Sequence, residues 1–197
     1  MNLLVTGGAG FIGSHYVIRH VQQHPDDAVV VLDKLTYAAD QSFLDAVADQ
    51  ITFVEGDIAD HDLVAGLIAD HQVDAIVNFA AETHVDMSID DAAPFLHTNI
   101  MGTQNLIEIC KQHPDLLLLH VSTDEVYGER FADEAPCTVD TPLRPGNPYA
   151  ATKAAADLMI LACVRTFGIR ARITRCTNNY GPHQDKTKLM PVIITKA

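Results

Sequence analysis

The fold of this chain is decided by residues 6–13, which read TGGAGFIG. A short apolar run precedes this stretch, and a run with helical periodicity follows it. Gly7, Gly10 and Gly13 have the spacing G-x-x-G-x-x-G, and Gly8 with the last two also satisfies G-x-G-x-x-G. Glycines at a strand-to-helix turn let the backbone approach a pyrophosphate, which binds free N–H groups at the helix N-terminus. The stretch therefore predicts a dinucleotide-binding turn.

The rest of the chain repeats this alternation of strand-like and helix-like runs. Strands that are apolar throughout and alternate with helices are typical of a parallel sheet covered on both faces. We therefore predict an α/β fold with a doubly wound parallel sheet (a Rossmann fold), and we expect one dinucleotide-binding domain over residues 1–197. Strands are expected at 3–6, 29–32, 51–54, 75–79, 116–121 and 170–176, helices at 11–24, 43–49 and 149–167, and a surface loop at 136–148.

An acidic residue follows the second expected strand at the distance that this fold requires. Asp33 lies 20 residues after Gly13, where a carboxylate accepts hydrogen bonds from ribose hydroxyls and repels a 2′-phosphate. The pattern predicts NAD, in preference to NADP, as the cofactor; the alternative is a glycine-rich turn with a helix-capping aspartate. Asp57 and Ile58 follow the third strand and are candidates for the adenine edge, although Asp57 is equally compatible with a plain helix N-cap.

Tyr149 and Lys153 are the first candidates for catalysis. Their spacing of four residues places both on one face of the expected helix. A nearby ammonium and a positively charged nicotinamide ring would favour the phenolate, which could then accept a hydroxyl proton while hydride leaves the same carbon. The alternative is a half-buried tyrosine beside a solvated lysine, but the glycine motif upstream favours the catalytic interpretation.

The composition excludes several other classes of protein. The 197 residues include 13 Lys and Arg against 26 Asp and Glu, a net charge of −13, which makes nucleic acid a poor partner. No apolar run is long enough for a membrane span, and we expect no secretory signal, because neither a basic region nor a cleavage site precedes the first apolar run. The four cysteines have neither metal-ligand nor redox spacing, so we expect reduced thiols, a cytoplasmic location and no metal site.

Taken together, these motifs resemble the extended short-chain dehydrogenase/reductase family, and within it most closely the dTDP-glucose 4,6-dehydratases. The resemblance spans all 197 residues, and the matching segments occur in the same order as in the family. Its most specific part is Thr123-Asp124-Glu125, because related epimerases carry small residues at the second and third of these positions. That tripeptide lies within the matching segment 122–128, and the other matching segments are 5–14, 32–37, 78–86, 148–153 and 178–182.

The resemblance implies a redox-neutral removal of water from a nucleotide sugar, with dTDP-glucose as the expected substrate. Tyr149 and Lys153 would support oxidation of C4 by NAD, and Thr123 would hydrogen-bond the C4 oxygen. Glu125 would be the base at C5, and Asp124 the acid for the departing C6 hydroxyl, after which hydride returns to C6. The catalytic set is therefore Thr123, Asp124, Glu125, Tyr149 and Lys153.

The family's binding residues carry over to matching positions. Those expected around NAD are Gly7, Gly10, Phe11, Ile12, Gly13, Asp33, Lys34, Leu35, Thr36, Asp57, Ile58, Phe79, Ala80, Ala81, Glu82, Thr83, Thr98, Tyr149, Lys153 and Asn179. Those expected around the sugar nucleotide are His84, Thr123, Asn178, Lys188 and Leu189, while Met87 stands where the family usually has arginine. The resemblance also implies a homodimer through helices around 98–111 and 149–167, and a C-terminal substrate-binding region that we expect to be missing here.

Two alternatives remain open at this point. The first is a nucleotide-sugar epimerase or decarboxylase on the same scaffold, against which Asp124 and Glu125 argue. The second is an NAD-binding fragment that is inactive alone.

Overall fold

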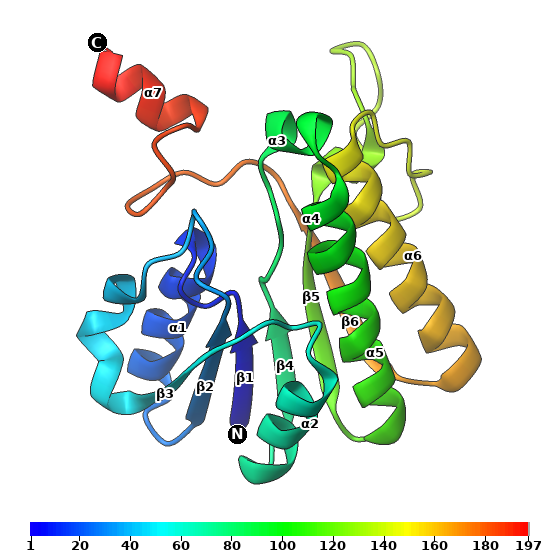
Figure 1. Ribbon diagram of the computed structural model, residues 1–197. Coiled ribbons are helices and arrows are strands. Elements are labelled where there is room, and N and C mark those ends of the chain that lie inside the picture. The colour runs from blue at the N-terminus through cyan, green and yellow to red at the C-terminus, as the bar shows by residue number, and fades with distance from the viewer. Residues whose placement is uncertain (197) are drawn as a thin grey trace.

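The computed structural model describes residues 1–196, and its centre is a parallel sheet of six strands in the order β3-β2-β1-β4-β5-β6 (Figure 1). The strands are β1 (Asn2–Thr6), β2 (Ala28–Asp33), β3 (Ile51–Glu55), β4 (Ala75–Asn78), β5 (Leu117–Thr123) and β6 (Arg170–Cys176). The order reverses between β1 and β4, as in a doubly wound fold. The predicted fold class is confirmed, with strand ends within two residues of those expected.

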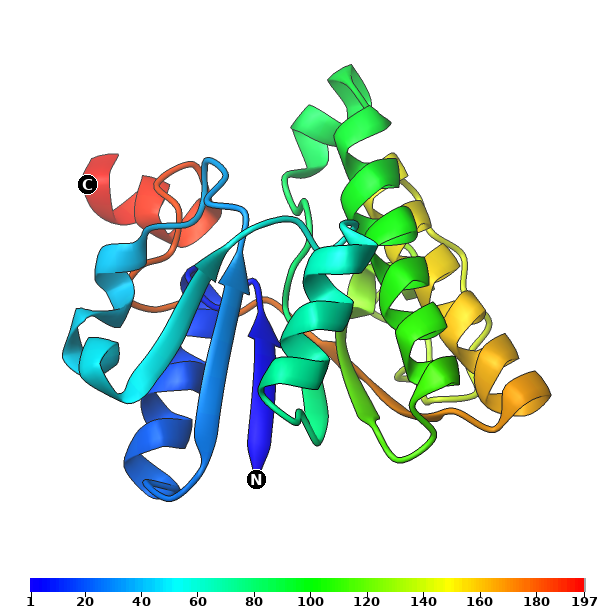
Figure 2. The ribbon, with the colours of Figure 1, turned by 60° about the horizontal axis from the view of Figure 1, so that its bottom comes forward.

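Helices cover both faces of the sheet, as Figure 2 shows. The helices are α1 (Phe11–Gln23), α2 (His61–Asp70), α3 (Val85–Asp90), α4 (Ala93–Phe95), α5 (Thr103–Gln112), α6 (Pro148–Phe167) and α7 (Leu189–Lys196). Three further elements are the 3-10 helices η1 (Gln41–Gln50) and η3 (Asp124–Tyr127) and the π-helix η2 (Leu96–Gly102). No helix in the described part of the chain is long and apolar enough to cross a membrane.

Alternate residues of the central strands β1, β2 and β4 pack into two separate cores. Leu4, Val30 and Ile76 face α2, α5 and α6, while Val5 and Val31 face α1 and η1 on the opposite side. Successive side chains of a strand point to opposite faces, so a strand covered on both sides must be apolar at every position. This double burial explains why the central strands lack a polar alternation, whereas the edge strand β6 has one.

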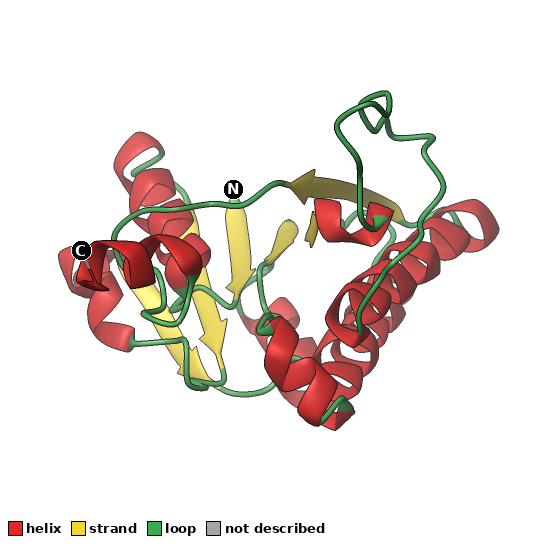
Figure 3. Cartoon of the chain, turned by 90° about the horizontal axis from the view of Figure 1, so that it is seen from above, coloured by secondary structure: helices red, strands yellow, loops and turns green. Residues whose placement is uncertain are grey.

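The carboxyl ends of the strands meet at one edge of the sheet, seen from above in Figure 3. The turn after β1 leads to α1 on one face, and the segment after β4 leads to the helices on the other. In a doubly wound sheet such a reversal leaves a crevice outside the carboxyl ends, where ligands bind. The topology therefore places the candidate site above β1 and β4.

Two expected elements differ in detail. The helix expected at 43–49 is the 3-10 helix η1, whose first turn is capped by Asp40, which accepts a hydrogen bond from Ser42 N at 2.9 Å. The helix expected around 98–111 begins as the π-helix η2 before it continues as α5. A wide turn of this kind is frequent at functional sites, and here it carries Asn99 into the interior.

We predict that Gly13→Ala destabilises the fold by about 1–3 kcal/mol, the usual cost of overpacking. A Cβ at Gly13 would lie 2.2 Å from Gly7 O, so α1 would have to move away from the turn. Gly66→Ala on α2 is the matched control, because its Cβ would have nothing within 4 Å. That control should gain about 0.5–1 kcal/mol. Urea unfolding of both variants measures the difference, and equal stabilities would contradict the prediction.

Candidate active site

In the turn between β1 and α1, Ala9 N donates to Asp33 Oδ2, while the N-terminus of α1 has no side-chain cap. Gly7 has a positive φ of 68°, and a Cβ there would lie 2.5 Å from Ala80 N, so only glycine fits. Gly10 is the N-cap of α1 and offers no side-chain cap. Uncapped N–H groups at a helix N-terminus attract an anion. The turn therefore provides a cradle for a phosphate group.

Asp33 is a buried carboxylate beside this cradle. Its Oδ2 accepts a hydrogen bond from Ala9 N and its Oδ1 one from Leu35 N, both at 2.9 Å. Burial raises the pKa of Asp33, and these backbone N–H groups oppose the rise. The carboxylate is thus held rigidly with its remaining lone pairs directed to the cleft, which suits a pair of ribose hydroxyls.

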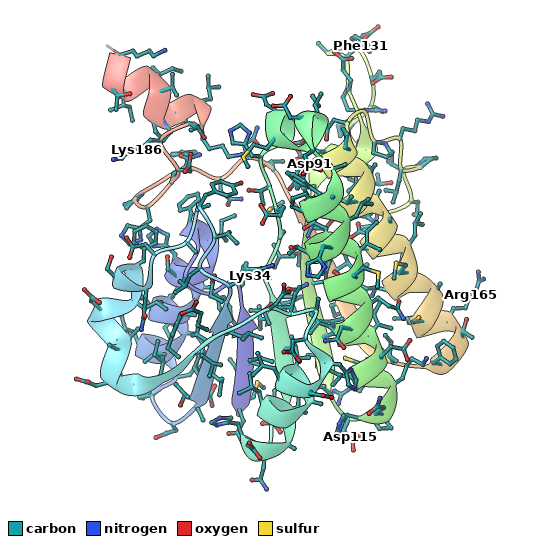
Figure 4. The ribbon with its side chains drawn as sticks, in the orientation of Figure 1. Lys34, Asp91, Asp115, Phe131, Arg165 and Lys186 are labelled. Atoms are coloured by element: carbon teal, nitrogen blue, oxygen red, sulfur yellow. The ribbon has the colours of Figure 1, made fainter. Side chains whose placement is uncertain are left out.

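Asp57 closes the far end of the cleft with two basic side chains. Lys34 Nζ lies 2.6 Å from its Oδ2, and His97 Nε2 lies 2.9 Å from the same oxygen. Burial would raise the pKa of Asp57, but the hydrogen bonds from Lys34, Ala59 N and His97 outweigh it and lower the pKa. Figure 4 shows Lys34 between the part of the molecule around β2 and β3 and the part around α4 and α5. The N-cap of α2 is Asp60, so Asp57 is not that cap.

Most of the residues predicted from the sequence line one cleft. Of those expected around the cofactor, all but Leu35 line it, and of those expected around the sugar nucleotide Thr123, Asn178 and Lys188 do. The cleft is also lined by residues that the sequence did not assign to the site: Leu32, Tyr37, Ala38, Ala39, Gly56, Val121, Ser122, Cys176, Thr177, Gln184 and Asp185. Several of these carry no chemical signal in the sequence, because they are apolar or lie on loops.

Four predicted residues lie outside this cleft. Leu35 has a positive φ of 53° and packs its side chain against the core beneath α1. Leu189 is 72% exposed on α7, which stands apart from the sheet in Figure 1. His84 lies 3.2 Å from Thr187 Oγ1 through its Nε2. Asp124 lines a neighbouring cavity, which Glu125 shares with the main cleft.

Tyr149 and Lys153 are both buried on the inner face of α6. Tyr149 N donates to Ser88 Oγ at 3.1 Å, and Lys153 Nζ donates to Val121 O at 2.8 Å. Burial raises the pKa of the Tyr149 phenol, and the nearby Glu125 carboxylate adds to the rise. Burial lowers the pKa of the Lys153 ammonium to about 8. Burial therefore disfavours the charged form of each residue, and a cationic ligand nearby would favour the Tyr149 phenolate.

Thr123, Asp124 and Glu125 stand at the carboxyl end of β5, where the strand turns into η3. Thr123 Oγ1 accepts a hydrogen bond from Glu125 N at 3.2 Å and so caps this short helix. Asn147 Nδ2 donates to Glu125 Oε2 at 3.2 Å, while its own Oδ1 caps α6 by accepting from Ala150 N. Asn147 thus links the Glu125 carboxylate to the helix that carries Tyr149.

Asn99 is a structural residue of the site that the sequence analysis missed. It exchanges hydrogen bonds with the backbone of Glu82, at 2.9 and 3.0 Å, and donates to Thr152 Oγ1 at 2.9 Å. It therefore ties the segment after β4 to α6. No local motif announces this role, since its partners lie 17 and 53 residues away. An asparagine inside an apolar helical pattern is the one available signal.

Comparison with known proteins places this geometry among sugar-nucleotide enzymes. The family model described as GDP-mannose 4,6 dehydratase matches residues 4–197. The chain is 52% identical to a dTDP-glucose 4,6-dehydratase of Mycobacterium tuberculosis over 99% of its own length and 58% of the relative's. The structure of DesIV, a dTDP-glucose 4,6-dehydratase from Streptomyces venezuelae with NAD and TYD bound, superimposes with a TM-score of 0.92 at 49% identity.

A second enzyme class shares the fold at lower identity. The UDP-glucose 4-epimerase of Thermus thermophilus in complex with NAD has a TM-score of 0.88 at 31% identity, and the alignment covers 99% of this chain and 61% of the epimerase. The alignment with DesIV covers all of this chain and 62% of DesIV. The chain thus spans about three fifths of the length of the relatives that it matches. Because the family model matches nearly all of it, the chain belongs to the GDP-mannose 4,6 dehydratase family and is a homologue of dTDP-glucose 4,6-dehydratases.

Proposed function

We propose that the protein is an NAD-dependent nucleotide-sugar 4,6-dehydratase, with dTDP-glucose as its substrate. The observation that carries the proposal is that Tyr149 and Lys153 line the same cleft as Thr123 and Glu125. A redox centre and a carboxylate beside it are the two parts that oxidation followed by elimination requires. The relatives named above supply the substrate class.

The cleft residues fit NAD. The pyrophosphate would bind at the glycine turn through the N–H groups of Phe11 and Ile12, and Asp33 would accept from the ribose hydroxyls. The adenine would lie near Asp57 and Ile58, and Tyr149 and Lys153 would hold the nicotinamide end. When bound, NAD accepts hydride from C4 of the sugar and later returns it to C6.

We predict that Asp33→Ala weakens NAD binding by about ten- to a hundredfold. The loss of charge-assisted hydrogen bonds to a ligand costs about 1.5–3 kcal/mol. NADP binding should fall less, because the substitution also removes the repulsion of the 2′-phosphate. Calorimetric titration of both dinucleotides measures the two changes. Asp49→Ala, at an exposed carboxylate of η1, is the control and should bind like wild type; a loss there as large as at Asp33 would contradict the assignment.

The chain's own residues divide the chemistry between two carbons. Tyr149, as phenolate, takes the proton of the C4 hydroxyl, and the Lys153 ammonium stabilises that phenolate. Once C4 is a ketone, the hydrogen on C5 becomes acidic and Glu125 removes it as a proton. Asp124 donates a proton to the C6 hydroxyl, which leaves as water, so that a C5–C6 double bond forms before C6 is reduced.

The proposal is tested by incubating the protein with NAD and dTDP-glucose and measuring the mass of the sugar nucleotide by mass spectrometry. UDP-glucose, CDP-glucose and GDP-mannose run in parallel. Loss of one water without net accumulation of NADH is the expected result. Inversion at C4 without a change of mass would instead support the epimerase alternative. We further propose that a region like the C-terminal part of the relatives, which this chain does not match, completes the sugar-nucleotide site. Any longer form of the protein is therefore assayed beside these 197 residues. NAD binding without turnover by the shorter form alone would support the fragment alternative.

We also propose a homodimer, formed through the outer faces of the helical segment 98–111, which comprises the end of η2 and most of α5, and of α6. Leu158 and Leu161 lie three residues apart on α6 and are 56% and 49% exposed. Met101 on the π-helix η2, which leads into α5, is 59% exposed. We predict that Leu161→Glu converts a dimer to a monomer in light-scattering measurements, because a charge would be buried in an apolar contact. Val139→Glu, on the loop before α6, is the control and should leave the mass unchanged. A monomeric wild type would contradict the proposal.

A further inference from the structure

Behind Lys153, polar side chains form a buried row across three neighbouring strands. Thr6, Asn78 and His120 are register partners on β1, β4 and β5, and each is at most 1% exposed. Thr6 Oγ1 donates to Asn78 Oδ1 at 2.6 Å, and Asn78 Nδ2 lies 3.0 Å from His120 Nδ1. Polar groups at such fully buried strand positions are costly, and the proposed mechanism uses none of the three.

The row ends at the catalytic lysine. His120 Nε2 lies 3.3 Å from Lys153 Nζ, which donates in turn to Val121 O at 2.8 Å. Val121 is at the carboxyl end of β5 and lines the cleft. The imidazole therefore contacts the ammonium from the side away from the cleft, while the backbone carbonyl holds it at the cleft.

Asp157 is a competing partner for this ammonium. It follows Lys153 by one helical turn on α6 and is completely buried. Its Oδ2 accepts from Arg175 Nε at 2.8 Å, but its Oδ1 has no hydrogen-bond partner among the described residues. A buried carboxylate and a buried ammonium attract each other strongly. Nevertheless, the described part of the chain contains no ion pair between Asp157 and Lys153.

His120 occupies the space between these two charges. Its Nε2 is 3.3 Å from Lys153 Nζ and 3.9 Å from Asp157 Oδ1. Burial, aided by the Lys153 charge, lowers the pKa of His120 well below its ordinary value, so the ring adds no third positive charge beside Lys153 and Arg175. The contact with Asn78 prevents the ring from swinging aside.

We propose that His120 is a positioning residue that acts as a spacer, keeping Lys153 Nζ at the cleft and preventing its collapse onto Asp157. The inference rests on the proposed use of Lys153 at the nicotinamide end of the cleft. Without the ring, Nζ would exchange its contact with Val121 O for an ion pair with the free Oδ1. The lysine would stay folded and charged, but it would no longer reach the cofactor or Tyr149.

The test compares His120→Ala with the double variant His120→Ala/Asp157→Asn. The single variant should bind NAD about tenfold more weakly, because one charge-assisted hydrogen bond to the cofactor is lost. The double variant should recover wild-type affinity within about threefold, because the neutral amide no longer draws Nζ away and still accepts from Arg175. A purely structural role for His120 would not be rescued by a second buried substitution.

A second readout needs no cofactor. Carbon NMR of labelled lysine follows the Lys153 ammonium, whose signal is assigned by its loss in Lys153→Arg. From about 8 in the wild type, the pKa of Lys153 should rise in His120→Ala, because the carboxylate then contacts it directly, and fall again in the double variant. His120→Gln, which keeps a neutral polar group in the space, should resemble wild type in both readouts.

An unchanged NAD affinity and an unchanged Lys153 pKa in His120→Ala would overturn the spacer, as would a double variant no better than the single one. If His120→Ala does not fold, as judged by circular dichroism, His120→Thr opens part of the same space on a residue that suits a strand, and the same criteria apply. Failure of the wild type to bind NAD would overturn the proposed function, while the Lys153 titrations would still decide the spacer.

Discussion

Glu125→Gln is expected to leave oxidation at C4 intact and to slow the loss of water by about 10²–10⁴-fold, the usual contribution of a general base. Glutamine has nearly the same shape and can still accept the hydrogen bond that Asn147 donates to Glu125 Oε2. It cannot take a proton from C5. The variant should therefore bind dTDP-glucose and accumulate reduced cofactor without forming product.

Two measurements separate these steps. Near-ultraviolet absorbance follows reduced cofactor, and mass spectrometry in deuterated water follows both water loss and exchange at C5. Glu129→Gln, an exposed neighbour just beyond η3, is the matched control and should behave like wild type. Water loss at the wild-type rate in Glu125→Gln would assign the base at C5 to another residue.

Tyr149→Phe should slow oxidation at C4 by about 10²–10⁴-fold while leaving NAD binding nearly unchanged. The ring of the variant can stay packed edge-on against Phe95, so the fold of α6 should be retained. Only the acceptor of the C4 hydroxyl proton is lost. Tyr180→Phe, at an exposed tyrosine near the end of the chain, is the control.

The pH dependence provides the second readout for Tyr149. Burial raises the pKa of its phenol, so in the wild type the phenolate fraction, and with it the rate of C4 oxidation, should increase as the pH rises. NAD brings a positive ring close to the phenol and should lower that pKa. In Tyr149→Phe the residual rate should lose this rise. A parallel slope in both proteins would exclude Tyr149 as the titrating group.

Asp157 has a second role beside the one that concerns Lys153. Asp157 serves Arg175, which in turn donates to Tyr127 Oη at 2.8 Å beneath η3. The carboxylate therefore supports the element that carries Asp124 and Glu125. If Asp157 also formed an ion pair with Lys153, one buried carboxylate would link the lysine near the nicotinamide to the η3 element that carries Asp124 and Glu125. By keeping Lys153 away from Asp157, His120 would prevent that link.

Local patterns in the sequence were sufficient to predict the fold and the centre of the cleft. Apolar runs of strand length, the glycine spacing and the interval from Gly13 to Asp33 are all set by neighbours in the chain, and the structure has the corresponding sheet and turn. The interval from Tyr149 to Lys153 is likewise a property of one helix. Backbone periodicity determines such features, so they can be predicted without knowledge of the packing.

Tertiary packing alone decided the rest. Asn99 links two segments because it lies on the inner side of the π-helix η2, within reach of Glu82 and Thr152. Leu35 lies outside the cleft because its side chain packs against the core beneath α1. His120 contacts Lys153 only because α6 packs against the face of β5. Contacts between residues distant in sequence depend on which elements pack together, and no local spacing records them. The sequence by itself therefore determined the scaffold and the residue types of its site, while the tertiary structure decided which side chains hold those residues in place.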